Sequence, residues 1–398
     1  MILAIGRRQW ALGCALGVLL AGTPSAVHAQ NPTATGTQAC DSASVRPCAC
    51  ASMRPCARAP VRLTFTGDIN LGTSLLKGGV PADTLPSPFA QVDSLFSGDL
   101  VIGNFEGAFS DTLPAAKCEG RSNCYEFRTP HWMVRRLVEA GFTTLNQANN
   151  HASDLGVPGR DETRQVMDSV GIQHYGILGE IAFDTIRVGD SSSVVAVVGF
   201  TTYDFAYDLL QIDRAKEVVD SVSQLADVVI VTFHGGAEGK KATHVKRGMD
   251  RMGGEKRGDL RRFTHAVIDA GADVVVGHGP HVLRAMEFYK GRLIAYSMGN
   301  FVTWHGFNMT GVNGLTGVLQ LEVNGDGSFA SGRFVPLRQV KWVGVVPDRS
   351  RAALAQVRNL TRADFPATGA RFAADGSITQ PPTSLPARGR MQTTRRHR

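Results

Sequence analysis

Short apolar runs alternate with amphipathic stretches through the middle of the chain. The runs are rich in valine, isoleucine and phenylalanine, which is typical of strands buried on both faces of a sheet. The predicted strands are Val61–Thr66, Leu100–Gly103, Phe142–Leu145, Val194–Phe200, Val228–Phe233 and Val274–Gly277. The predicted helices between them are His131–Ala140, Pro158–Val170, Asp213–Leu225 and Asp259–Ala270. This alternation predicts an α/β fold with a largely parallel sheet.

The pattern changes after Gly277, where short strands are joined by turns. The strands expected here are Ala285–Tyr289, Arg292–Ser297 and Gly317–Val323. Strands joined by tight turns pair antiparallel. This part therefore predicts either a second, antiparallel sheet or an extension of the first. We expect the folded domain to span residues 61–347.

The chain begins with the layout of an export signal. Arg7-Arg8 precede an apolar run, Trp10–Ala21, and small residues follow up to Ala29. The run is shorter than the ~20 residues that span a bilayer, which favours a signal peptide over residues 1–29 rather than a membrane anchor. The arginine pair also fits a twin-arginine signal, so the export route stays open. We expect an exported protein, periplasmic or extracellular, that is soluble after cleavage.

Cysteine usage fits an oxidising compartment, because six of the seven cysteines follow the predicted signal peptide. Cys118 and Cys124 enclose a short polar loop, and we expect a disulfide between them. The other four lie in a Pro- and Ala-rich linker, residues 30–60: Cys40, Cys48, Cys50 and Cys56. Their pairing stays open. A zinc knuckle is the alternative, although one residue between two of them is poor spacing for zinc ligands.

The positive charge of the chain is unevenly distributed. The formal net charge is +7, and the last eleven residues contain five arginines and no acid. This composition predicts a disordered basic tail over residues 348–398. A second basic segment, Lys240–Arg262, contains nine Lys or Arg residues and three acids. It is either a solvated helix face or a lip that steers an anionic substrate, with Lys256 and Arg257 taking part.

Five of the predicted strands are followed by small residues and metal-ligating side chains. In chain order the clusters are Gly67-Asp68-Ile69-Asn70, Asn104-Phe105-Glu106, Asn149-Asn150-His151 with Asp154, His234-Gly235-Gly236-Ala237-Glu238, and Gly277-His278-Gly279-Pro280-His281. Taken singly, most of these residues are turn, capping or packed side chains. The carboxyl ends of parallel strands meet at one sheet edge, however, and a mixed oxygen and nitrogen donor set suits Mn, Fe or Zn. The clusters together predict a site for two divalent ions that activate water and neutralise a phosphoryl group.

With these motifs and the block Tyr296–Phe301, residues 61–303 resemble the bacterial capsule synthesis family of CapA type, which is involved in poly-γ-glutamate synthesis. That family is similar to the calcineurin-like metallophosphoesterases. The resemblance implies an α-β-β-α fold, in which a two-sheet sandwich is flanked by helices. It also implies an exported, metal-dependent, phosphoesterase-like hydrolase that acts in the synthesis of a capsule or cell-envelope polymer.

The resemblance also assigns roles to individual residues. The implied metal ligands are Asp68, Glu106, Asn150, His234, His278 and His281. His151 would be the catalytic acid that protonates the leaving oxygen. Residues expected to bind substrate or to support the ligands are Asn70, Asn104, Asn149, Asp154, Glu238, Lys256 and Arg257. Compared with the general phosphoesterase pattern, an asparagine replaces a histidine at position 70, Asn104-Phe-Glu106 replaces a Gly-Asp pair, and the last two histidines are three residues apart. Fewer charged ligands predict weaker metal binding.

The expected partners are an anionic cell-envelope polymer or a phosphoester substrate, together with membrane-bound proteins of polymer synthesis. Nucleic acid is not expected, because no recognised binding motif is present and only 7% of the residues are aromatic. The alternative function is a non-catalytic component that binds nascent anionic polymer in the same groove.

The export hypothesis predicts a mature protein that begins at Gln30 when the chain is expressed in a secreting bacterium. Amino-terminal sequencing and peptide mapping of the unreduced protein test this directly. A retained leader, or free thiols at both Cys118 and Cys124, would contradict the expectation.

Overall fold

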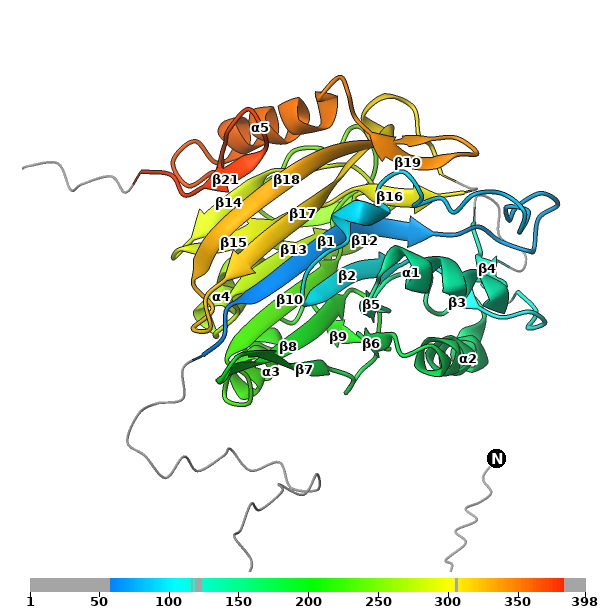
Figure 1. Ribbon diagram of the computed structural model, residues 1–398, viewed down its shortest axis with the longest axis horizontal. Coiled ribbons are helices and arrows are strands. Elements are labelled where there is room, and N and C mark those ends of the chain that lie inside the picture. Colours follow the sequence, from blue (N-terminus) through cyan, green and yellow to red (C-terminus); the bar gives the residue numbers. More distant parts are fainter. Residues whose placement is uncertain (1–57, 116, 119–123, 305–306, 383–398) are drawn as a thin grey trace, which may run out of the picture. The chain divides into compact units, whose positions relative to one another are not determined.

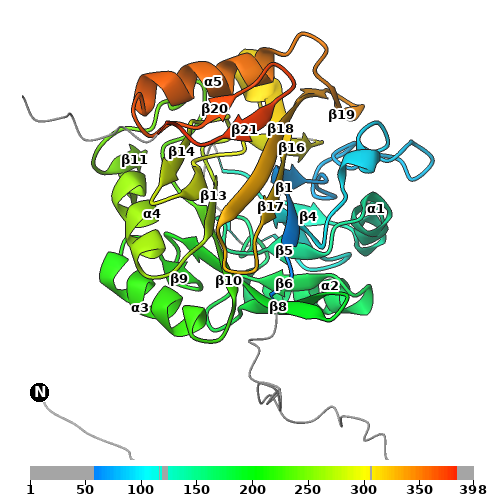
Figure 2. The same cartoon turned by 60° about the vertical axis from the view of Figure 1, so that its left-hand side comes forward.

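The computed structural model describes residues 58–115, 117–118, 124–304 and 307–382. These residues form two large mixed β-sheets that face one another, with helices on the outer faces (Figure 1, Figure 2). The expected α/β sandwich of two sheets flanked by helices is confirmed. The predicted signal peptide and nearly all of the predicted linker lie outside the described residues.

The first sheet has ten strands, in the order β20-β21-β18-β17-β1-β2-β5-β6, with β16 beside β1 and β19 beside β18. Its strands are β1 (Val61–Asn70), β2 (Leu100–Phe105), β5 (Thr144–Asn146), β6 (Gln173–Tyr175), β16 (Asn300–Thr303), β17 (Leu315–Val323), β18 (Phe329–Val340), β19 (Gly344–Pro347), β20 (Arg371–Phe372) and β21 (Ser377–Thr379). The strands β1, β2, β5 and β6 are parallel, and β17 pairs antiparallel with β1.

The second sheet has seven strands, in the order β14-β15-β13-β10-β8-β7, with β9 beside β8. Its strands are β7 (Ala182–Val188), β8 (Ser191–Thr201), β9 (Tyr207–Asp208), β10 (Val228–His234), β13 (Val274–His278), β14 (Met286–Tyr289) and β15 (Arg292–Ala295). Strands β8, β10, β13 and β15 are parallel. The turn-rich region after Gly277 therefore extends both sheets and forms no sheet of its own among the described residues.

The central strands are buried on both faces, which explains their continuous apolar runs. In β13, Val274 and Val276 point into the core between the two sheets, whereas Val275 packs into the core beneath the helices. The alternation of β10 is the same, with Ile230 between the sheets and Val231 on the helix side. Side chains that alternate across a strand thus supply two separate cores.

Five helices cover the sheets: α1 (Val134–Ala140), α2 (Gly156–Ser169), α3 (Ile212–Ser223), α4 (Leu260–Asp269) and α5 (Ala352–Asp364). Helices α3 and α4 lie over the seven-stranded sheet, and α1 and α2 over the ten-stranded sheet (Figure 2). Helix α3 buries Ala215, Val218, Val219 and Val222, one face of an amphipathic helix. Within the described ranges, none of the helices is long and apolar enough to span a membrane.

Several short elements complete the fold. The small two-stranded sheets are β3 (Ala108–Phe109) with β4 (Arg128–Thr129), and β11 (Asp250–Met252) with β12 (Glu255–Gly258). Single 3-10 turns cover Asp93–Leu95, His131–Met133 and Gly311–Gly314. The second of these precedes α1, so the helix expected from His131 begins as a 3-10 turn.

The expectation of a disordered tail from residue 348 is wrong as far as residue 382. Helix α5 and strands β20 and β21 follow the predicted domain end (Figure 2). Ala353, Leu354 and Val357 of α5 enter the core between the two sheets. The residues that α5 buries have helical spacing, so the sequence contained the signal for this helix: Ala353, Leu354, Val357, Leu360 and Thr361. The basic residues 383–398 lie outside the described part.

Replacement of Leu354 by alanine tests whether α5 belongs to the folded domain. The side chain is 2% exposed, so Leu354→Ala is expected to lower the free energy of unfolding by about 2–5 kcal/mol. Denaturant unfolding measures the change. The control Arg358→Ala, on the exposed side of the same helix, should stay within about 0.5 kcal/mol of wild type. Equal effects of the two substitutions would contradict the packing of α5.

Candidate metal centre

The carboxyl ends of strands from both sheets meet at one place. Asp68 near the end of β1 pairs in register with Asn104 of β2, and His234 at the end of β10 pairs with His278 of β13. The parallel direction of each pair puts its polar residues at the same edge. The five clusters expected from the sequence therefore come from two sheets rather than one.

Asp68 is fully buried and is held by three side chains. The amide nitrogen of Asn104 donates to its Oδ1 at 2.9 Å, and Nδ1 of His278 donates to the same oxygen at 3.1 Å. His281 Nδ1 donates to Oδ2 at 3.0 Å. Burial raises the pKa of Asp68, but the hydrogen bonds from the two histidines outweigh burial and hold this pKa well below its usual range.

Glu106 is equally buried, yet neither of its carboxylate oxygens has a hydrogen-bond partner among the described residues. Its Oε1 lies 3.7 Å from His234 Nε2 and 3.6 Å from His281 Nε2. Burial raises the pKa of Glu106 well above its usual value. Burial also lowers the pKa of His234 well below its usual value. A cation beside these two groups would stabilise both the ionised carboxylate and the neutral imidazole.

These donors fit a divalent metal ion. Ligand atoms of Asp68, Glu106 and His281 lie within 4.8 Å of one another. His234 Nε2 and Asn150 Oδ1 are also buried without a hydrogen-bond partner among the described residues. Because an unsatisfied buried polar atom is costly, and because oxygen and imidazole donors suit divalent cations of this type, the geometry favours a metal at this point.

Two features of the backbone hold the cluster in place. A β-carbon on Gly67 would lie 2.0 Å from the carbonyl oxygen of Gly299, so only glycine allows β1 to approach this turn. Asp68 N then donates to the same oxygen at 2.9 Å. His281 has a φ of 56°, in the left-handed region. Strain of this kind typically costs about 1–3 kcal/mol and occurs at functional positions.

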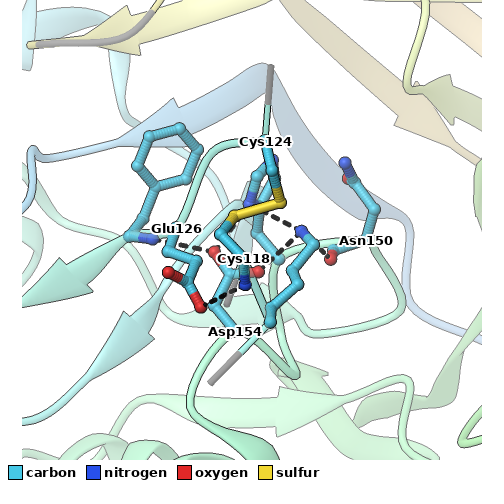
Figure 3. The surroundings of a disulfide bond; sticks show 8 residues. Cys118, Cys124, Glu126, Asn150 and Asp154 are labelled. Atoms are coloured by element: carbon cyan, nitrogen blue, oxygen red, sulfur yellow. Dashed lines mark hydrogen bonds and ion pairs between the residues drawn. A yellow bond between two sulfur atoms is a disulfide. The ribbon is translucent and has the colours of Figure 1, made fainter. Parts of the chain in front are cut away.

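His151 lies in a second polar group beside the metal ligands. Its Nδ1 donates to Asp154 Oδ2 at 2.7 Å, which leaves Nε2 free of that bond. Burial lowers the pKa of His151, although Asp154 opposes the shift. Lys117 Nζ donates to Asp154 Oδ1 at 2.7 Å and to the carbonyl oxygen of Asn150 at 2.9 Å. Figure 3 shows Asn150 and Asp154 beside the disulfide between Cys118 and Cys124, the pairing expected from the sequence.

A cavity of about 540 Å³ connects the two groups. Predicted site residues that line it are Asn150, His151, Glu238 and His281. The other lining residues include Lys117, Tyr125, Phe127, Met252, Asn300 and Phe307. The ring of Phe307 lies 5.0 Å from that of His281 and 5.4 Å from that of Phe127. The cavity thus has polar groups beside the ligands and aromatic rings around them.

Two of the predicted site residues, Asn70 and Asn149, form hydrogen bonds to the loops that carry the metal-ligating side chains. Asn70 donates to the carbonyl oxygen of Glu106 at 3.0 Å and accepts from Gly72 N at 3.0 Å. Asn149 donates to Asn104 Oδ1 at 3.0 Å and to the carbonyl oxygen of Phe105 at 2.9 Å. Their side chains are therefore engaged in fixing loops, and neither lines the cavity.

The middle of the basic segment Lys240–Arg262 is not a helix face. Residues 250–258 form the β11–β12 hairpin, and within the segment only Leu260–Arg262 belong to α4. Arg257 is 2% exposed and pairs with Glu238 and with Tyr203 Oη. It cannot act as a solvent-facing lip, because its inward position on β12 places the guanidinium against these partners. Lys256 is exposed.

The sequence analysis missed Lys117, Asn300 and Phe307. Lys117 is adjacent to a cysteine, and its role depends on a loop closure that a sequence pattern does not reveal. Asn300 stands in register beside Asp68 across the β1–β16 pair, and its Oδ1 is buried without a partner among the described residues. The signal for Asn300 was present, because it follows the apolar run of β15 as the other clusters follow their strands.

Comparison with known proteins gives one family. The model of the family described as "Bacterial capsule synthesis protein PGA_cap" matches residues 62–304. The PGA biosynthesis protein CapA of Bacillus subtilis (strain 168) is 30% identical over 284 residues, which cover 67% of this chain and 69% of that protein. The capsule biosynthesis protein CapA of Bacillus anthracis is 33% identical over 262 residues, or 62% of this chain and 61% of that one.

Solved structures are more distant. The crystal structure of a 5′-nucleotidase precursor from Thermus thermophilus is 14% identical, with a TM-score of 0.36, and the match covers 77% of this chain and 59% of that chain. At this distance the similarity carries no statement about activity.

The metal centre predicts opposite effects of Glu106→Gln on the apo and metal-loaded protein. In the metal-free protein burial opposes ionisation of Glu106, so a neutral amide at this position should raise the free energy of unfolding by about 1 kcal/mol. The stabilisation that added Mn²⁺ or Zn²⁺ gives to wild type should shrink in the variant, since it depends on affinity for the folded state. Thermal unfolding with chelator and with metal measures both. Glu217→Gln, on the exposed side of α3, is the control, and a Glu106 variant that behaves like it would refute the site.

Proposed function

This chain belongs to the bacterial capsule synthesis protein PGA_cap family, and on that basis we propose that it is an exported, metal-dependent hydrolase of a phosphoester or amide bond in a cell-envelope polymer. The polymer class follows from the family and from the names of the two CapA relatives. The hydrolase activity is inferred from the site. We also propose that membrane-bound proteins of polymer synthesis are its partners.

One observation carries the proposal. The unpartnered carboxylate of Glu106 lies 3.6 Å from His281 and 3.7 Å from His234, and His281, which also binds Asp68, lines the same cavity as His151. Structural residues in a core would have their hydrogen bonds satisfied by the protein. Perturbed acids and bases beside a cavity are more typical of a catalytic site.

The ligands of the proposed metal site are Asp68, Glu106, Asn150, His234, His278 and His281. When bound there, a divalent ion supplies Lewis-acid chemistry: it polarises the scissile group and makes water a stronger nucleophile at neutral pH. Two ions are expected from the family resemblance. The hydrogen bonds from Asn104 and the histidines keep Asp68 ionised and correctly turned for this role.

His151 is proposed to hold and deliver the proton of the leaving group. Asp154 accepts from Nδ1, so the ring is fixed with its Nε2 available. Its position on the cavity wall puts it within reach of a substrate beside the metal ligands. Phe127, whose ring lies 4.3 Å from that of His151, limits the access of water to the acid.

The second candidate is a non-catalytic component that binds anionic polymer in the same cavity. The observation that favours it is the small number of carboxylates: among the described residues, only two acids belong to the cluster that could hold a metal. Metal binding with no turnover on any phosphoester, and with measurable affinity for poly-γ-glutamate, would support this candidate.

The two roles beside the metal predict different failures. His151→Ala should retain the metal content of wild type and lose about 10²–10⁴ in rate on substrates with poor leaving groups, and much less on aryl phosphates that depart unprotonated. Asp68→Ala should lose metal and activity together. Metal analysis and a series of leaving groups, measured on the same preparations, separate the two.

Either result in these variants is decisive. A loss of metal in His151→Ala equal to that in Asp68→Ala makes His151 a ligand and removes the proton-transfer role. If all variants match wild type in metal content and in every assay, the hydrolase proposal fails and the polymer-binding candidate replaces it.

A further inference from the structure

Lys117 is a cation on the wall of the cavity that the proposed chemistry does not use. Its side chain is 27% exposed and lies between the buried carboxylate of Asp154 and the carbonyl oxygen of Asn150. Among the described residues that line this cavity, Lys117 is the one lysine or arginine. The acid of the same wall, Glu238, is already paired with Arg257.

The ammonium group of Lys117 has one hydrogen left over. Two of its three N–H bonds point to Asp154 Oδ1 and to the carbonyl oxygen of Asn150. A third neighbour, His151 Nδ1 at 3.4 Å, is no acceptor, because it donates its own hydrogen to Asp154 Oδ2. Phe127 N donates to the same Oδ2 at 2.8 Å. Within the described structure, the third hydrogen of Lys117 therefore has only the cavity to face.

The position of Lys117 is fixed before any ligand arrives. The next residue, Cys118, is bonded to Cys124, which itself lines the cavity. Glu126 Oε1 accepts from Cys118 N at 2.9 Å, on the other side of the disulfide (Figure 3). A long lysine side chain normally loses much rotamer freedom when it binds a ligand. Here two hydrogen bonds and a cross-linked neighbour have removed that freedom in advance.

We propose that Lys117 is a substrate-binding residue, whose third hydrogen is donated to an oxyanion of the substrate while the Cys118–Cys124 disulfide holds it in place. The oxyanion is either a phosphoryl oxygen or a carboxylate of the polymer. This inference rests on the proposed function only in placing the substrate in the cavity. A purely structural lysine, which merely neutralises Asp154, would have no effect on the binding of an anion.

The test is the affinity of the full-length protein for two anions, inorganic phosphate and short γ-glutamate oligomers, measured by calorimetry. Lys117→Met should weaken the binding of one of them about 10- to 100-fold, the usual range for loss of a hydrogen bond to a charged group. Lys117→Arg should restore part of it, because the cation is kept. Lys216→Met, an exposed lysine of α3, should bind like wild type. The anion that responds identifies the group recognised.

Removal of the disulfide gives a second, independent test of the inference. The double variant Cys118→Ser/Cys124→Ser should also bind that anion more weakly than wild type, but the loss of affinity should be smaller than in Lys117→Met. Lys117 keeps its charge in this variant and loses only its fixed position. Mutation of this pair leaves the cysteines of residues 30–60 unchanged, whereas a reductant would act on them as well. Where turnover is measurable, Lys117→Met should raise KM more than it lowers kcat.

The outcomes separate this inference from the proposed function. Anion binding that depends on Lys117, in a protein without hydrolytic activity, keeps the inference and removes the hydrolase. If the Lys117→Met variant binds both anions as tightly as wild type, the inference is wrong, whatever the hydrolytic activity of the protein. A Lys117→Arg variant as weak as Lys117→Met, with normal thermal unfolding, would also overturn it, because the cation would then not be what binds.

Discussion

The centre of this protein depends on a buried carboxyl group whose oxygens receive no hydrogen bond from the described residues. Glu106 is fully buried and both of its carboxylate oxygens lack a partner among the described residues. Removal of a charged group from water costs several kcal/mol unless it is paired. Its nearest basic atoms are two imidazole nitrogens, 3.6 and 3.7 Å away. Asp68, buried to the same degree, has its charge stabilised by hydrogen bonds instead.

Such a group is kept in place by the packing of the fold around it. The strands that end at the site continue into two apolar cores, one between the sheets and one beneath the helices. Gly67 lets β1 approach the turn at Gly299, and the left-handed backbone of His281 is held by its surroundings. The free energy gained by burying the valines of β10 and β13 offsets the strain and the desolvation at their carboxyl ends.

The sequence predicted the strands better than it predicted their partners. The apolar runs at Val228 and Val274 are continuous, and their ends follow as expected. Which sheet each strand joins depends on long-range packing, so the apolar runs did not show that β1 and β10 belong to different sheets. Helix α5 was missed although its buried residues, from Ala353 to Thr361, have regular helical spacing. The basic composition of the C-terminal region, which predicts disorder, outweighed that spacing.

At the site, the residue types were predictable and the hydrogen-bond roles were not. Asp68, Glu106, His234 and His281 meet as the strand ends indicated. Arg257, by contrast, was expected at the surface, and it is buried against Glu238. Lys117 was missed, because its contact with Asp154 joins positions 37 residues apart. Nothing in the local pattern of either segment encodes that contact.

Asn104 shows why the amide-rich departures from the phosphoesterase pattern are not simple losses of ligands. Its Oδ1 accepts from Asn146 at 2.9 Å and from Asn149 at 3.0 Å. Its Nδ2 donates to Asp68 at 2.9 Å. An aspartate at this position could not donate, and it would bring a further negative charge against a carboxylate that is already buried. The amide orients Asp68 without adding charge, so Asp68 and Glu106 can lie close together in the buried cluster.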